Sequence, residues 1–349
     1  MIELRSDTFT TPTADMLAAM ASATQGDDVY GEDPTVRELE ELAAHTLGKD
    51  AGCLMPSGTM ANLACLMAHA PRGTKVLVGR ESDIYIYEAG GASVCGGLVY
   101  EPIDNQPDGT LRIADLVEGC PKDPEDPQFA LPAVVCVENT QNRCGGRILS
   151  AEHLADVRAF ADDRGLRLHL DGARLFNAAA GSGRTPAEIA APADSVQFCL
   201  SKGLSAPIGS MVVGDRELVA KARRIRKMLG GGMRQAGFIA AAGIVAIKTA
   251  DRLVEDHANA RRLAIGLADI PGVEIDPEVV ETNICMFRVT APGWTLPAFF
   301  AAAREHGLAL AELGHGRARA VTHRGVGARD IDDAVDIVAK VLASGKGVA

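Results

Sequence analysis

The fold is decided by two stretches of sequence: Leu-Arg-Leu-His-Leu-Asp-Gly-Ala-Arg at residues 166–174 and Gln-Phe-Cys-Leu-Ser-Lys-Gly-Leu-Ser at residues 197–205. The first alternates apolar and polar residues and ends its apolar run at Asp171, as a β-strand does. The second places Lys202 just after a short apolar run. The 31 positions from Asp171 to Lys202 leave room for one helix and one further strand. The sequence therefore predicts that the two side chains stand at the ends of neighbouring strands.

Short β-type runs and helical segments alternate on both sides of these stretches. The expected strands are 52–55, 75–78, 98–103, 133–138, 166–171, 195–200 and 210–213. The expected helices are 34–47, 59–70, 112–119, 151–164 and 215–229. This alternation predicts an α/β fold with a mostly parallel sheet covered on both faces. Ligands of such sheets bind at the carboxyl ends of the strands, where Asp171 and the segment leading into Lys202 are expected.

The last third of the chain has a different pattern. A long alanine-rich helical region covers 234–269. After it we expect strands at 273–275 and 283–289, a helix at 295–306, a strand at 317–322 and a closing helix at 329–343. We interpret this region as a second, smaller α+β domain. The expected division is a large domain of residues 1–250, which includes the N-terminal segment, and a small domain of residues 251–349.

The composition and net charge of the chain exclude some classes of binding partner. The 349 residues are 47% hydrophobic and 23% charged, and the formal net charge is −11. An acidic chain is a poor general partner for nucleic acid or for an anionic membrane. The longest apolar stretch, 238–247, is too short to span a bilayer, and the charged N-terminus lacks a secretory pattern. The eight cysteines form no Cys-x-x-Cys pair, so neither a metal site nor a disulfide framework is expected. We expect a cytoplasmic chain.

A lysine and an aspartate at neighbouring strand ends are what pyridoxal phosphate chemistry requires. The amine of Lys202 would form the Schiff base, and the Asp171 carboxylate would keep the pyridine nitrogen protonated. A surface lysine and a loop aspartate are the alternative interpretation. The segment 56–62 adds a helix start at which Gly58 permits close approach and the Thr59 hydroxyl can donate to a phosphate, although an ordinary helix cap has the same residues.

Longer motifs resemble the low-specificity L-threonine aldolases of the beta-eliminating lyase family, which are fold type I enzymes similar to aspartate aminotransferase. The resemblance rests on the segments 4–8, 26–36, 56–59, 87–91, 169–177, 199–204, 226–235 and 319–323, in that order along the chain. It implies an amino acid substrate, pyridoxal phosphate as the cofactor, and a homotetramer of close dimers that share active sites.

The resemblance also implies residue roles. Lys202 would be the Schiff-base lysine and Asp171 the partner of the pyridine nitrogen. Cofactor binding would fall to Gly58, Thr59, Asp171, Arg174, Lys202, Lys227 and Arg234, with Lys227 and Arg234 reaching the phosphate of a neighbouring subunit. The substrate carboxylate would be held by Ser6, Arg174 and Arg319, since the planar fork of arginine suits a carboxylate.

Three positions depart from the family pattern, which has histidine where this chain has Asp83, Gln128 and Gln141. Asp83 cannot stack on a pyridine ring as an imidazole does, but it can accept a proton from a β-hydroxyl or pair with a polar substrate side chain. Gln128 can hydrogen-bond the substrate but cannot accept a proton near neutral pH. Altered chemistry and a merely weakened activity are the two interpretations.

The sequence thus predicts a pyridoxal phosphate-dependent lyase that cleaves the Cα–Cβ bond of a β-hydroxy-α-amino acid to glycine and an aldehyde, with Asp83 in a catalytic role. The alternative keeps the cofactor and changes the reaction to β-elimination, racemisation or a pathway-specific aldol reaction. A third hypothesis, a catalytically idle binding protein on the same scaffold, conflicts with the presence of Lys202, Asp171, Arg174 and Arg319.

Overall fold

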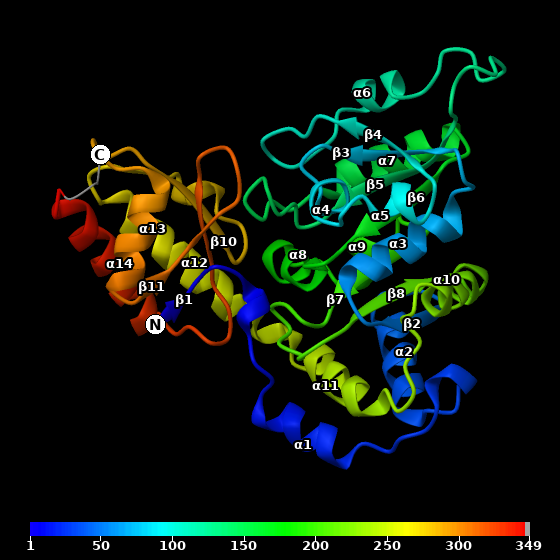
Figure 1. The fold of residues 1–349 in the computed structure, drawn as a ribbon, viewed down its shortest axis with the longest axis horizontal. Coiled ribbons are helices and arrows are strands. Elements are labelled where there is room, and N and C mark those ends of the chain that lie inside the picture. The colour runs from blue at the N-terminus through cyan, green and yellow to red at the C-terminus, as the bar shows by residue number, and fades with distance from the viewer. Residues whose placement is uncertain (346–349) are drawn as a thin grey trace.

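A seven-stranded sheet forms the centre of the larger unit in this computed structural model, which describes residues 1–345 (Figure 1). Its strands are β2 (Ala51–Met55), β3 (Lys75–Gly79), β4 (Val99–Ile103), β5 (Pro132–Glu138), β6 (Arg167–Asp171), β7 (Ser195–Cys199) and β8 (Ser210–Gly214). They lie in the order β2-β8-β7-β6-β5-β3-β4. Strand β8 runs antiparallel to β2 and β7, while all pairs from β7 to β4 are parallel. The expected mostly parallel sheet is confirmed.

Helices cover both faces of this sheet. They are α1 (Ala14–Ser22), α2 (Pro34–Thr46), α3 (Gly58–His69), α4 (Asp83–Ile86), α5 (Gly91–Val94), α6 (Ile113–Glu118), α7 (Ala151–Asp163), α8 (Leu175–Ser182), α9 (Pro186–Ala190), α10 (Arg216–Met228) and α11 (Gly237–Lys248). The α2 start matches its sequence signals, because the Asp33 side chain accepts from the amides of Thr35 and Val36, and Pro34 fills the first turn.

Successive side chains along each strand point to opposite faces of the sheet and so belong to two different cores. Leu168 and Leu170 of β6 join the core beneath α2, α7, α8 and α11, and Val196 and Phe198 of β7 do the same. The residues between them, including His169 and Asp171, therefore face α3 on the other side. This opposite face carries the polar side chains from which the site described below is built.

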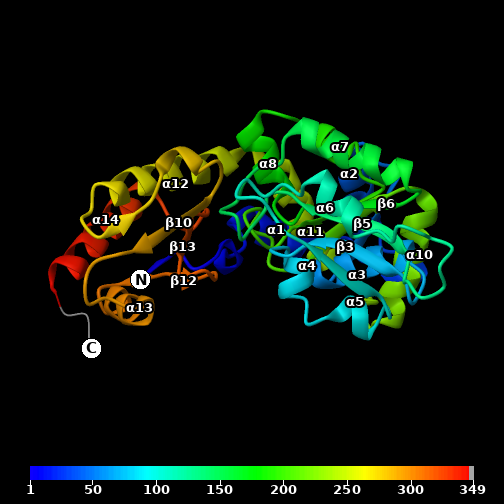
Figure 2. The same cartoon turned by 90° about the horizontal axis from the view of Figure 1, so that it is seen from above.

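The smaller unit packs three helices against an antiparallel sheet (Figure 2). The helices are α12 (Leu253–Ala268), α13 (Leu296–Glu305) and α14 (Ala328–Ala343). The sheet order is β12-β13-β10-β9, formed by Ala311–Glu312, Ala318–Val321, Ile284–Val289 and Val273–Glu274. The single long helix expected over 234–269 is instead two helices, α11 and α12, because a 3-10 turn at Ala250–Arg252 separates them.

The N-terminal segment belongs to the smaller unit by its contacts. Strand β1 (Ile2–Glu3) pairs in parallel with β11 (Leu308–Ala309), and Leu4 is buried in the core of the smaller unit. A two-residue strand has too little sequence pattern to reveal its partner in advance. The division at 250/251 stays a prediction, with β1 crossing it.

No membrane crossing is present in residues 1–345, since none of the helices there combines the required length with sufficient apolar character.

Candidate active site

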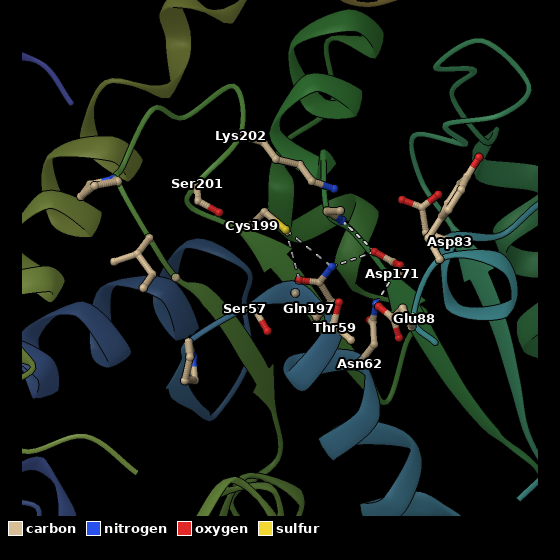
Figure 3. A pocket seen from close by; sticks show the side chains of 17 residues that line it. Ser57, Thr59, Asn62, Asp83, Glu88, Asp171, Gln197, Cys199, Ser201 and Lys202 are labelled. Atoms are coloured by element: carbon tan, nitrogen blue, oxygen red, sulfur yellow. Dashed lines mark hydrogen bonds between the residues drawn. The ribbon is translucent and has the colours of Figure 1, made fainter. Parts of the chain in front are cut away.

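A cavity of about 260 Å³ opens where β6 and β7 end and α3 begins (Figure 3). Five of the residues singled out from the sequence line it: Lys202, Asp171, Asp83, Gly58 and Thr59. They come from four different segments separated by up to 144 positions. The position of the cavity at the carboxyl ends of the strands agrees with the rule for parallel sheets.

Lys202 and Asp171 point into this cavity from neighbouring segments (Figure 3). Asp171 is the last residue of β6, and Lys202 lies in the loop that follows β7. The backbone carbonyl of Lys202 accepts hydrogen bonds from the Thr10 hydroxyl at 3.0 Å and from the Ser205 amide at 2.8 Å. These contacts fix the loop and leave the Lys202 amine free to reach the cavity.

Three donors hold the Asp171 carboxylate. The Asn62 amide donates to Oδ2 at 2.9 Å, the Gln197 amide donates to Oδ1 at 2.8 Å, and the backbone amide of Ala173 donates to Oδ1 at 3.0 Å. Burial raises the pKa of Asp171, whereas the Lys202 charge and these hydrogen bonds oppose the rise. The result is a fixed and unusually basic carboxyl group, suited to bind a protonated ring nitrogen.

Helix α3 presents its N-terminus to the same cavity. The Ser57 side chain caps the helix by accepting from the Met60 amide at 3.2 Å, while Gly58 and Thr59 face the cavity. A Cβ at Gly58 would lie 3.0 Å from the sulfur of Cys199, so glycine lets the helix approach β7 closely. The arrangement combines a helix N-terminus with a hydroxyl donor and is able to bind a phosphate.

Arg174, which follows the cavity-lining residue Ala173 in the sequence, forms a buried bidentate ion pair with Asp7. Its Nε and a terminal nitrogen donate to the two Asp7 carboxylate oxygens at 2.8 and 2.7 Å, and both side chains are buried. Although burial favours the neutral acid, the Arg174 guanidinium holds the pKa of Asp7 far below its ordinary value. Asp7 therefore positions Arg174, leaving its other terminal nitrogen for a further acceptor.

Arg319 is buried without a carboxylate partner among residues 1–345. It is 8% exposed, donates to the Asn142 side chain at 2.9 Å and the Arg5 carbonyl at 3.0 Å, and has an Nε atom with no acceptor. Burial, together with the Arg174 charge, lowers the pKa of Arg319 to about 10, so it remains charged at neutral pH. A buried cation with a free donor is the feature expected of a binding site for an anion.

Asp83 is joined to Arg319 through Asn142. The Asn142 amide donates to Asp83 Oδ1 at 3.0 Å, while its own oxygen accepts from Arg319. The carboxylate of Glu138 accepts from the backbone amides of Asp83 at 2.7 Å and Asn142 at 2.9 Å. Burial, with the charge of Asp83, raises the pKa of Glu138 well above its ordinary value. Asp83 is thus held opposite Lys202 and Asp171 with one oxygen still available.

Six predicted residues do not line this cavity: Arg174 and Arg319, described above, and Ser6, Gln128, Lys227 and Arg234. Ser6 caps the first 3-10 turn by accepting from the Thr8 amide. Gln128 lies in an exposed turn and donates to Asp126. Lys227 lines a separate hollow, and Arg234 is paired with Asp27 at 2.8 Å. Neither Lys227 nor Arg234 lines the cavity of its own chain.

The structure adds polar residues that received no role from the sequence: Asp7, Asn62, Glu88, Gln197 and Asn142. Gln197 carried a usable signal, because a polar side chain at an alternate position of an otherwise apolar strand must find a buried partner. Asn62 carried a weaker one, three positions after Thr59 on the same face of α3. Asn142 lies in a turn and Asp7 begins a three-residue 3-10 helix, and neither is long enough to show a sequence period.

Gln141, the third departure from the family histidines, is buried beside this site. Its amide donates to the Glu81 carbonyl at 2.8 Å, and its side-chain oxygen accepts from the Cys144 amide at 2.7 Å. Its role is therefore to hold two loops together.

Comparison with known proteins places these residues in a family. A family model described as beta-eliminating lyase matches residues 3–292. The chain belongs to the beta-eliminating lyase family. It is 46% identical over 290 residues to the low specificity L-threonine aldolase of Escherichia coli (strain K12), covering 83% of this chain and 85% of that one. It is 41% identical over 335 residues to low-specificity L-threonine aldolase 1 of Arabidopsis thaliana, covering 95% and 93%.

The fold agrees with this membership. A solved threonine aldolase from Leishmania major superimposes with a TM-score of 0.82 over 98% of this chain and all of that one, at 21% identity. The predicted fold type I architecture is confirmed.

The residues of the cavity fit pyridoxal phosphate, the cofactor of the predicted enzyme class. A helix N-terminus, a lysine amine and a buried carboxylate with three fixed donors meet in one cavity of about 260 Å³. Each matches one functional group of the cofactor: the phosphate, the aldehyde carbon and the ring nitrogen. This family member is a pyridoxal phosphate-dependent carbon–carbon lyase.

Proposed function

We propose that the chain cleaves the Cα–Cβ bond of a β-hydroxy-α-amino acid to glycine and an aldehyde, the reaction for which its threonine aldolase relatives are named. The observation that carries the proposal is the buried, unpaired Arg319 beside the cavity that holds Lys202 and Asp171. It supplies a site for the α-carboxylate next to a site for the cofactor. When bound, pyridoxal phosphate supplies the electron sink for bond cleavage at Cα.

The residues of the chain would orient the substrate. Arg319, through its free Nε, and Arg174, through the nitrogen that Asp7 leaves open, are the proposed carboxylate ligands, with Ser6 contributing from the N-terminal segment. At an effective dielectric of about 20, one such contact contributes about 4 kcal/mol before desolvation costs. Fixing the carboxylate also fixes which bond at Cα is aligned for cleavage.

Asp83 is the proposed acceptor of the β-hydroxyl proton. Asn142 donates to one of its oxygens and leaves the other for the substrate, so the carboxylate can accept without moving. The same geometry suits a hydrogen bond to a polar group further along the substrate side chain. Gln128 is proposed to contact substrate only across a subunit boundary, since it is exposed and away from the cavity of its own chain.

We also propose a cytoplasmic homotetramer in which Lys227 and Arg234 serve a neighbouring subunit. Support comes from the hollow of about 430 Å³ that Lys227 lines with Val29 and Gly232, and from the exposed Tyr30 and Met228 nearby in sequence. Exposed apolar side chains beside a basic hollow are typical of an interface. Sedimentation of the cofactor-loaded protein gives the test, and a monomer with full activity would contradict the shared site.

Purified protein mixed with pyridoxal phosphate, then with threonine or allo-threonine, tests the reaction. We expect a visible absorption band from lysine-bound cofactor, followed by release of glycine and acetaldehyde. A protein without that band would contradict the cofactor assignment. A band without aldehyde from either isomer would contradict the simple aldolase and favour the second candidate.

The second candidate is a different reaction at the same site, such as β-elimination or racemisation. Asp83 favours it, because this chain has a carboxylate where the family pattern has an imidazole. The matched assay measures keto acid release and loss of optical activity with the same amino acids.

A further inference from the structure

A line of buried polar side chains leads away from the cavity between α3 and the sheet. His169 of β6 and Ser195 of β7 are fully buried and lie opposite each other in the strand pairing. Both face α3, where Asn62 is buried, and His69 lies at the end of the same helix. Apart from the contact of Asn62 with Asp171, none of these four residues has a role in the function proposed above. Buried polar groups persist only when their hydrogen bonds are satisfied.

Every link in this line is a hydrogen bond of ordinary length. His69 Nε2 lies 2.7 Å from the Ser195 hydroxyl, which lies 2.8 Å from His169 Nδ1. His169 Nε2 lies 2.9 Å from Asn62 Oδ1, and Asn62 Nδ2 donates to Asp171 Oδ2 at 2.9 Å. The line therefore connects His69 to the carboxylate that faces the cofactor ring.

The direction of all four hydrogen bonds follows from Asn62. Its amide nitrogen donates to two carboxyl groups, Asp171 and Glu88, so its oxygen must accept from His169 Nε2. A neutral His169 then carries no proton on Nδ1 and accepts from Ser195. The Ser195 oxygen, having donated its only proton, accepts from His69 Nε2. Each donor points towards Asp171.

Both imidazoles are neutral, as this direction requires. Burial lowers the pKa of His169 to about 3 and that of His69 to about 4. Hydrogen bonds aligned head to tail polarise one another, so each strengthens the donor that follows it. Asn62 is consequently a stronger donor to Asp171 than an isolated amide.

The outer end of the line lies near the amino ends of β6 and β7, opposite the ends at which the cavity opens. His69 lines a hollow of about 130 Å³ with charged residues of both signs: Arg167, Asp194, Asp215, Glu217 and Lys221. Arg167 begins β6 and Ser195 begins β7, whereas Asp171 ends β6. The line thus runs along β6 and β7 from the amino ends of these strands to their carboxyl ends.

We propose that His69, Ser195, His169 and Asn62 form a one-way hydrogen-bond chain that polarises and positions Asp171. Through this chain, a histidine near the amino ends of β6 and β7 adjusts the carboxylate that faces the cofactor ring. These are positioning residues, since they act through Asp171. The inference rests on the role proposed for Asp171. Breaking the chain leaves Asp171 more basic, which draws the shared proton away from the ring nitrogen.

The first test observes the chain directly. Nitrogen NMR of cofactor-loaded protein labelled at histidine reports which ring nitrogen carries the proton. We expect neutral rings protonated at Nε2 for both His69 and His169 at neutral pH. A proton on Nδ1 of His169, in a neutral or a charged ring, would reverse the hydrogen bond with Ser195 and overturn the proposal whatever the reaction is.

The second test breaks the chain at two places. We expect Ser195→Ala to weaken cofactor affinity about tenfold and His69→Leu about threefold, the range for loss of one hydrogen bond. Each should raise the pH midpoint of the visible absorption band, by up to about one pH unit. His153→Leu, at another half-buried histidine away from the cavity, is the matched control and should change neither quantity.

The double variant distinguishes a chain from two unrelated packing defects. Because His69 acts through Ser195, the double variant should match Ser195→Ala alone, whereas independent defects would add. Additive effects, or a His69→Leu midpoint equal to that of the control, would overturn the proposal. If Ser195→Ala does not fold, a comparison of His69→Leu with His69→Gln takes its place. Because glutamine keeps a hydrogen-bond donor, His69→Gln should restore the wild-type pH midpoint of the absorption band. Wild-type protein without any visible band would instead contradict the proposed function itself.

Discussion

The two sides of the cavity differ in how completely their polar groups are satisfied. On the cofactor side, Asp171 accepts three hydrogen bonds, and the residues that donate them are themselves held in place. On the substrate side, Arg319 keeps a buried donor without an acceptor, and Asp83 keeps one free oxygen. Asp171 and Arg319 are both buried, so the difference between these two groups is not one of solvent access.

Under the roles proposed above, this difference separates a permanent ligand from a transient one. A cofactor that stays bound can be met by groups fixed in a complete network. A substrate carboxylate must enter and leave, so its site has to exist with a donor unsatisfied between turnovers, at a cost of about 1–3 kcal/mol. The paired charges of Arg174 and Asp7 reduce that cost for one arginine, while Arg319 bears it alone.

The largest effect should come from Lys202→Ala on the cofactor side. Loss of the amine removes the covalent attachment and should lower kcat at least about a thousandfold. The visible absorption band should disappear at the same time. Steady-state assay of aldehyde release measures the first effect. Retention of both the band and the activity would remove Lys202 from the reaction.

Arg319→Gln should act on the substrate side alone. Removing one partner of a buried charged contact costs about 3 kcal/mol, or about a hundredfold in kcat/KM, and the band of bound cofactor should be unchanged. Arg288→Gln is the matched control, because Arg288 is exposed and donates to the His315 carbonyl. Equal losses in both variants would show that Arg319 does not bind the carboxylate.

Asp7→Asn should affect stability more than chemistry. It leaves the buried Arg174 charge unpaired, so the free energy of unfolding should fall by about 3 kcal/mol. Because the pKa of Asp7 is lowered by folding, its contribution is complete above its ordinary value near 3.8 and is lost as the pH falls towards the lowered value.

Urea unfolding from pH 7 to pH 3 measures this contribution. The gap between wild type and Asp7→Asn should be widest at neutral pH and should narrow only at the acid end. Asp332→Asn, in the exposed pair with Arg262, should unfold like the wild type. A gap independent of pH down to the most acid point would assign the effect to packing.

The smallest change is expected from Asp83→His, which restores the family residue. If Asp83 is retuned for another substrate, the variant should gain about tenfold in threonine cleavage, a modest share of what a general base contributes. Parallel assays with several β-hydroxy amino acids measure whether the substrate preference of the variant differs from that of the wild type. Unchanged rates on all of them would assign no role in specificity to Asp83.

The sequence by itself determined the cofactor side. Alternation of strands and helices predicts the parallel sheet, and Lys202, Asp171, Gly58 and Thr59 each stand at the end of an element where such sheets bind ligands. The positions of these residues follow from short local patterns, which can be recognised in a single sequence. The strand boundaries agree with the structure to within one residue.

Only the tertiary structure decided the substrate side and the polar chain behind Asp171. Asp7 meets Arg174 across 167 positions, and Asn142 meets Arg319 across 177. No period or cap marks such partners, because their pairing depends on how the N-terminal segment and the smaller unit pack against the sheet. Likewise, His169 and Ser195 show in the sequence as polar residues in apolar strands, but their alignment into one directed chain requires the register of β6 and β7 and the helix above them.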